Sequence, residues 1–203
     1  MSKIIRFILV AVLLSGSSAT FAQLSLSTYS ANSTIQVGNL KTFCQGPERP
    51  SLQVEININD EDKGLPGILY IGTINGDKTK AYFLSAAGWV AVGSGMIPAY
   101  SVVREGLQNA RLQIDLSTVP DLMTDTQNIY VGYGALSVAA ERSVQASITA
   151  LEKAKEKLPG RTVKTVDPDM HRLALIQEDL TKKAKYQFVL SSSNFPVCPG
   201  SGN

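Results

Sequence analysis

Residue types that commonly build catalytic and metal sites are scarce in this 203-residue chain, which has one histidine (His171), two cysteines and one tryptophan. A catalytic triad needs a base, an exposed nucleophile and an oxyanion hole, and one histidine cannot supply a zinc site alone. Gly93-Ser94-Gly95 lacks the spacing of a nucleophile elbow. We therefore expect no enzyme activity, no catalytic residue and no cofactor. Two carboxylates that meet in space to hydrolyse a glycoside stay open as an alternative.

The chain also lacks a marked charge excess, with 19 basic and 17 acidic residues. Lys3 and Arg6, at the N-terminus, account for that small difference. Nucleic acids and anionic membrane surfaces attract proteins through a clear basic excess. The composition therefore argues against both as partners.

Long apolar runs are missing after the first residues. Residues 7–14 are apolar, follow Lys3 and Arg6, and precede a stretch of small residues. This layout is typical of a secretory signal peptide, and the run is too short to span a bilayer. We expect residues 1–22 to be removed after Ala22, with Ala19 as the second choice and a retained anchor as the alternative. The mature protein is then periplasmic or extracellular, without a membrane span.

Cys44 and Cys198 lie near the two ends of the remaining chain. In an oxidising compartment two cysteines form a disulfide by default, and no Cys-x-x-Cys spacing indicates a redox or metal pair. We predict a disulfide that closes almost the whole folded body.

Alternating apolar residues dominate the middle of the chain. Leu52, Val54, Ile56 and Ile58 alternate with polar residues, as in a half-buried antiparallel strand. Further short strands follow with frequent turns, among them a tight Asn75-Gly76 hairpin. The pattern predicts a mainly β fold, an antiparallel, immunoglobulin-like β-sandwich over residues 51–198. Residues 23–50 form either a mobile N-terminal segment or an edge strand.

A polar turn with three consecutive acids, residues 60–62, follows the first clear strand. Clustered carboxylates are calcium ligands, so Asp60 and Asp62 are weak candidates for a metal site. The EF-hand spacing is absent, and a solvated turn is the simpler interpretation. No other metal ligand is predicted.

Aromatic residues recur along the predicted strands: Tyr70, Tyr82, Phe83, Trp89, Tyr100, Tyr130 and Tyr133. Exposed on one surface, they could bind a glycan or another small ligand. Strand alternation sends Tyr82 and Phe83 to opposite faces, so the set cannot share one surface. We interpret these aromatics as scaffold residues and place Trp89 in the core.

The order of short motifs gives a resemblance. Gly-x-x-Tyr at 67–70, Tyr82-Phe-Leu-Ser-x-x-Gly-Trp89, Pro98-Ala-Tyr100, Asp115-Leu-Ser117 and Tyr130-Val-Gly-Tyr-Gly134 occur in sequence. This order resembles a functionally uncharacterised β-sandwich module of secreted proteins from Gram-negative bacteria. The resemblance covers residues 60–134, and 184–191 as a last strand. It implies a fold and a location, and no activity.

Residues 136–183 depart from that pattern. Apolar residues recur there at helical spacing, and Pro159-Gly160 ends the first run. Asp167 is a candidate N-cap, with Pro168 at the first position of a second helix. We predict a helical hairpin inserted before the last strand. Its candidate interaction surface comprises Leu136, Val144, Ile148, Leu151, Leu173 and Ile176.

Two functions follow from these features. The first is a structural or protein-interaction module of the cell envelope, an adhesin-like or accessory subunit whose partner is an envelope protein or a second copy. The second is a glycan- or small-ligand-binding sandwich, with calcium as a weak further possibility. The helical stripe can equally pack on the sheet of its own domain.

Overall fold

The computed structural model describes residues 34–46, 49–93, 95–157 and 167–199. The predicted signal peptide, residues 23–33, Ser94 and the predicted helix stop at Pro159-Gly160 lie outside these ranges. Within them the fold is mainly β, with antiparallel sheets and two helices, as the alternating pattern predicted.

Nine strands and two α-helices make up the described part of the chain. In chain order they are β1 Gln36–Cys44, β2 Pro50–Asn57, β3 Gly67–Asn75, β4 Ala81–Ser85, β5 Gly88–Ala91, β6 Ser101–Val103, β7 Ala110–Asp115, β8 Gln127–Ala135, α1 Val138–Lys157, α2 Pro168–Lys182 and β9 Tyr186–Ser191. Short 3-10 turns follow β7 and β9.

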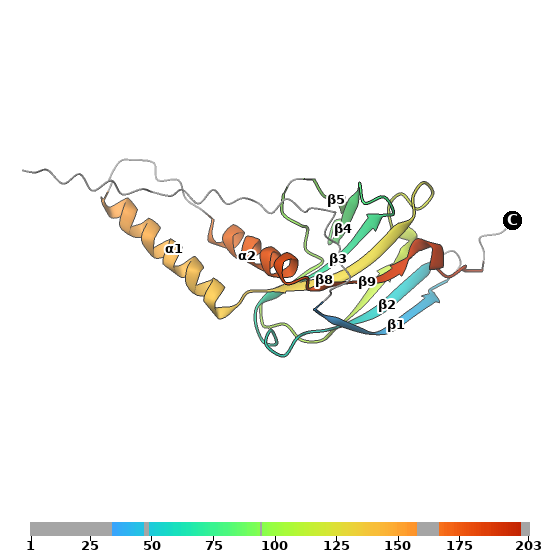
Figure 1. The fold of residues 1–203 in the computed structure, drawn as a ribbon, viewed down its shortest axis with the longest axis horizontal. Coiled ribbons are helices and arrows are strands. Elements are labelled where there is room, and N and C mark those ends of the chain that lie inside the picture. The colour runs from blue at the N-terminus through green and yellow to red at the C-terminus, as the bar shows by residue number, and fades with distance from the viewer. Residues whose placement is uncertain (1–33, 47–48, 94, 158–166, 200–203) are drawn as a thin grey trace, which may run out of the picture.

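The strands form two sheets, and every pairing in them is antiparallel. The smaller sheet has the order β1-β2-β7, so β1 is an edge strand next to β2. The larger sheet has the order β5-β4-β3-β8-β9, and β6 also pairs with the first residues of β3. Figure 1 shows the two sheets side by side, with the helices at one end of the molecule.

The main hydrophobic core takes side chains from both sheets. Leu52, Val54 and Ile56 of β2 are fully buried, as their alternation predicted. They share one cluster with Ile71 of β3 and Val131 of β8, in the larger sheet. Burial of these apolar side chains from both sheets is the main stabilising term for this part of the fold.

The predicted disulfide is present between Cys44, the last residue of β1, and Cys198, beyond β9. It joins residues 154 apart in the sequence and closes a loop around most of the described chain. In the chain-entropy account such a bond acts chiefly by restricting the unfolded state.

The larger sheet is covered on its outer face as well. All nine residues of β3 are buried. On the outer face Ile68, Tyr70 and Phe83 pack with Ile176 and Leu180 of α2 in a second hydrophobic cluster. The second predicted helix is therefore a layer of the fold, and it makes its closest packing across β8.

Trp89 corrects our placement of the tryptophan in the core. It lies on β5, at the edge of the larger sheet, where its side chain is only partly buried against the main cluster. Its indole Nε1 donates a hydrogen bond to Thr118 Oγ1, 3.1 Å away, in an exposed setting. The ring therefore packs at the margin of the main cluster, with its polar Nε1 end in an exposed setting.

Within the described ranges, neither helix has the length and apolar content needed to cross a membrane.

Candidate functional site

Each of the two helices starts next to a residue whose side chain caps it. The Ser137 hydroxyl accepts a hydrogen bond from the Ala140 N–H at the start of α1. The predicted cap of α2 is confirmed: the Asp167 carboxylate accepts from the Asp169 N–H at 2.9 Å, and Pro168 opens the helix. Such caps satisfy backbone N–H groups that have no partner within the helix.

The helix α1 runs outward from the end of β8, and α2 lies between it and the larger sheet (Figure 1). Most of the α1 surface is exposed, and Val144 is its one buried residue in the described chain. The two helices therefore differ in burial. The helix α2 is part of the folded body, whereas α1 projects from it with most of its surface exposed.

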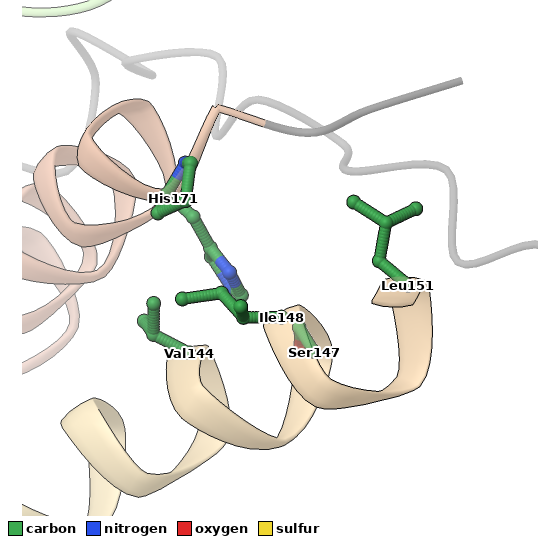
Figure 2. A pocket seen from close by; sticks show the side chains of 6 residues that line it. Val144, Ser147, Ile148, Leu151 and His171 are labelled. Carbon is green, nitrogen blue, oxygen red and sulfur yellow. The ribbon is translucent and has the colours of Figure 1, made fainter. Parts of the chain in front are cut away.

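A shallow apolar cavity of about 80 Å³ lies between the two helices. Val144, Ile148 and Leu151 of α1 line it, with His171 of α2 opposite them; Ser147 and Pro168 complete it (Figure 2). The imidazole of His171 is therefore a partly buried wall of this cavity.

A two-pronged ion pair fastens α1 to α2 beside this cavity. Arg172 donates from Nε to Glu141 Oε2 at 2.8 Å and from Nη2 to Glu141 Oε1 at 2.7 Å. Asp169 accepts a further bond from Arg172 Nη1. Hydrogen bonds from Arg172, and then from Gln145, lower the pKa of Glu141 from 4.5 to about 2. A planar guanidinium matches the geometry of a carboxylate, so the pair joins α1 to α2 through two parallel hydrogen bonds.

The helix α2 is held on the sheet by polar anchors as well as by apolar contacts. The Gln177 side-chain oxygen is buried and accepts from the Ile97 N–H at 2.9 Å. Asp179 Oδ2 accepts from the Ala135 N–H, also at 2.9 Å, at the end of β8. Each bond satisfies a backbone N–H that sheet pairing leaves without a partner.

A buried charged cluster sits where α2, β8 and the loop before β3 meet. Lys185 is 1% exposed, and its ammonium lies 2.6 Å from Asp62 Oδ2 and 2.7 Å from Asp179 Oδ2. The Tyr133 hydroxyl donates to Asp62 Oδ2 at 2.9 Å and accepts from the Asn59 N–H. The Lys185 ammonium also lies 5.3 Å from the centre of the Tyr133 ring. We call these four side chains, Asp62, Tyr133, Asp179 and Lys185, the Lys185 cluster.

The protonation states of two cluster members follow from their surroundings. Burial raises the pKa of Asp179, but hydrogen bonds from Lys185, Ala135 and Lys183 outweigh it, so the pKa is lowered and Asp179 stays ionised. Burial raises the pKa of Tyr133 far above its ordinary value, so its hydroxyl remains a donor. Buried charges of this kind are costly unless they are paired and hydrogen-bonded.

The two candidate calcium ligands do not share a site. The Asp60 side chain is 95% exposed and pairs with Lys63, whereas the Asp62 carboxylate is buried against Lys185 and Tyr133. Among the residues that the structure describes, no three His, Cys, Asp or Glu side chains come together as a metal site requires.

The predicted aromatic residues are spread over both faces of the larger sheet. Tyr70 packs edge-on against Phe83 under α2, and Tyr133 points into the main core. Tyr82 faces the other way from Phe83, as strand alternation predicted, and donates to Asp121. Tyr100 packs at the margin of the main cluster. Tyr130 forms an edge-to-face pair with Phe188, whose side chain is 48% exposed.

The predicted interaction residues separate into two groups. Leu136, Leu173 and Ile176 pack on the outer face of the sheet, with Leu136 and Ile176 buried. Val144, Ile148 and Leu151 line the cavity between the helices. Sequence reasoning missed the Lys185 cluster, because Asp62 and Lys185 are 123 residues apart and no periodic signal links them.

Searches against models of known protein families, against curated proteins and against solved structures returned no match. The resemblance to a secreted β-sandwich module therefore stays a prediction from motif order.

Proposed function

We propose that this chain is a non-enzymatic structural or protein-interaction module of the cell envelope, located in the periplasm or outside the cell. The signal-peptide pattern and the disulfide support this location, since disulfides persist in oxidising compartments. Its partner is a protein, either an envelope component or a second copy of the chain.

The fold that fits this proposal is an immunoglobulin-like β-sandwich. In a variable-type immunoglobulin domain one sheet contains strands A, B, E and D, and the other contains strands C″, C′, C, F and G. The order β1-β2-β7 corresponds to A-B-E, and the order β5-β4-β3-β8-β9 corresponds to C″-C′-C-F-G.

Three departures from that pattern are informative. The strand β6 pairs with β3, where an immunoglobulin domain would place it beside β7. The disulfide joins β1 to the segment after β9, away from the two-sheet interior. Trp89 lies on β5, outside the position that packs on an inter-sheet disulfide. The similarity to an immunoglobulin domain is therefore one of strand order, and we do not infer an immune function from it.

The observation that carries the interaction proposal is the position of α1 and α2. They connect β8 to β9, where variable domains carry one of their binding loops. The sheet holds α2, and α2 holds α1 through the Arg172–Glu141 pair. This construction presents a mostly exposed helix and the apolar cavity beside it, an arrangement suited to an apolar segment of a partner protein.

A photo-reactive residue in place of Ser147 tests this surface in cells of the native host. Ser147 lines the cavity from an exposed position on α1. We expect a discrete adduct whose size identifies the partner as a second copy or another protein. Met123, which is 98% exposed in the β7–β8 connection, is the matched control position. Equal adducts from Ser147 and Met123 would contradict a specific docking surface.

A second function, glycan binding, is favoured by one feature. Tyr130 and Phe188 form an edge-to-face pair on the larger sheet, with ring centres 5.7 Å apart, and Phe188 is 48% exposed. Aromatic faces of this kind stack on sugars. If this is the function, glycans raise the melting temperature and Phe188→Ala abolishes that rise. A rise that survives Phe188→Ala would exclude this pair as the binding surface.

A further inference from the structure

The Lys185 cluster has a composition that its structural role does not require. One ammonium contacts two carboxylates at 2.6 and 2.7 Å, and 1% of the lysine side chain is exposed. A buried ion pair stabilises a fold weakly at best, and apolar residues of similar volume often do as well. The fold nevertheless holds a lysine amine against a carboxyl group away from solvent, which brings the two partners of a possible amide bond into contact.

We propose that Lys185 and Asp62 join in an intramolecular isopeptide bond, with Asp179 carrying the protons of the reaction. The proposal concerns the cluster alone and does not rest on the function proposed above. It describes a single event within each molecule, so it assigns no enzyme activity.

The reaction balances without any added reagent. One proton passes from the Lys185 ammonium, by way of Asp179, to Oδ2 of Asp62, which leaves a neutral amine beside a neutral acid. The lone pair of Nζ forms a bond to Cγ of Asp62. A second proton then passes from Nζ to Oδ2, the Cγ–Oδ2 bond breaks, and that oxygen leaves as water. The pair carries no net charge before or after, and Asp179 returns to its carboxylate form.

The cluster excludes water and brings the two reacting groups into contact. The Asp62 side chain is 5% exposed and that of Lys185 is 1% exposed, so both reactants are withdrawn from water. Contact in the folded state also replaces a bimolecular encounter, which raises the rate of such reactions.

The hydrogen bonds around the two carboxylates assign their roles. Asp179 accepts from the Ala135 N–H and from Lys183 Nζ as well as from Lys185, and these donors stabilise its carboxylate form. Asp62 Oδ2 is contacted by the Lys185 amine and by the Tyr133 hydroxyl. Tyr133 receives the Asn59 N–H and is thereby oriented as a donor toward Asp62. Asp62 is accordingly the acceptor, Asp179 the proton carrier and Tyr133 a positioning residue.

The bond would join the loop before β3 to the residue that precedes β9. These positions are 123 residues apart in the sequence. Together with the Cys44–Cys198 disulfide, it would give the molecule a second covalent closure, one that reductants cannot open.

The mass of the full chain tests this directly. The protein is expressed with its leader, purified, reduced and denatured, and its N-terminus is read from a tryptic peptide map. We expect an intact mass below the sequence mass by one water molecule. The map should contain a branched peptide that links the Asp62 and Lys185 segments, with no cleavage after Lys185. The branched peptide distinguishes this bond from other losses of water, such as succinimide formation.

Matched variants assign the roles. Lys185→Arg keeps a cation in the cluster but removes the amine, and its mass should equal the sequence mass. Lys182→Arg is the control, since Lys182 pairs with Glu178 from an exposed position outside the cluster, and it should keep the loss of water. Asp179→Asn should keep Lys185 and Asp62 but accumulate the uncoupled form.

Two results would overturn the proposal. One is a folded wild-type protein, judged by circular dichroism, whose mass equals the sequence mass. The other is a branched peptide that joins Lys185 to Asp179, which would assign the acceptor wrongly. Because the wild-type mass decides the first outcome, the test does not depend on any variant folding.

Discussion

Gly134 of β8 lies directly against Ile176 of α2: a Cβ at position 134 would stand 2.1 Å from the Ile176 carbonyl oxygen. Two residues earlier on the same face, a Cβ at Gly132 would stand 2.5 Å from the Lys185 carbonyl oxygen. Both distances are impossible for a real side chain. The two glycines of the Tyr130–Gly134 motif are therefore the positions that allow α2 to pack on the sheet.

The first prediction follows from this contact. Gly134→Ala should push α2 away from β8 and lower the free energy of unfolding by about 1–3 kcal/mol, as overpacking does. Gly93→Ala is the control, because a Cβ there meets nothing within 4 Å. Urea unfolding measures both. Equal stability of the two variants would contradict close packing of α2 on β8.

The disulfide gives the second prediction. Cys44 and Cys198 close a loop of 154 residues, so reduction should lower the free energy of unfolding by about 5 kcal/mol. The sheets should survive, because their cores do not depend on the bond, and far-ultraviolet circular dichroism checks this. Two free thiols in the unfolded, unreduced protein, detected by Ellman titration, would show that the bond is absent.

Local chemistry made part of this fold predictable. The alternation of Leu52, Val54 and Ile56 predicted β2, and the Asp167-Pro168 pair predicted the start of α2. Both predictions were possible because each signal lies within a few consecutive residues. The cysteines could be paired because only two are present.

The candidate site was less accessible to sequence reasoning. Lys185 lies between charged residues and a strand, in a context typical of a solvated lysine, and only the folded chain brings it to Asp62. The partial exposure of Trp89 depends on β5 being an edge strand, and sheet order is a non-local property. The apolar residues of the helices are divided between the sheet and the cavity because α1 runs away from the sheets (Figure 1), and the sequence does not give that direction.

Acid sensitivity of the helical hairpin is the third prediction. Arg172 lowers the pKa of Glu141 from 4.5 to about 2, so this pair stabilises the fold above pH 4.5, and the contribution is lost as pH falls toward 2. Because the Glu141 side chain is 36% exposed, screening limits its contribution to about 1 kcal/mol or less. The Glu141→Gln variant should melt below wild type at pH 7 and match it near pH 2.

The control for this measurement is Glu152→Gln, an exposed acid later on the same helix. It should melt as wild type does at both pH values. A Glu141→Gln difference that persists undiminished at pH 2 would mean that the carboxylate charge is not the cause.

The fourth prediction concerns the anchor of α2. Gln177→Leu removes the buried acceptor of the Ile97 N–H and leaves that donor unpaired, which costs about 1–3 kcal/mol. Gln113→Leu, at an exposed position on β7, should change stability by less than about 0.5 kcal/mol. Thermal unfolding of the two variants provides the comparison, and an equal loss would contradict a specific anchor.

If the α1–α2 surface binds a protein partner, as we propose, a charge placed in its cavity should prevent binding. Leu151→Asp puts a charge in the cavity, and Ala150→Asp puts the same charge on the exposed face next to it. Each is combined with the photo-reactive residue at position 147 in the native host, after circular dichroism has established that both fold. We predict that Leu151→Asp abolishes the adduct and that Ala150→Asp retains it. Retention of the adduct in both variants would contradict the claim.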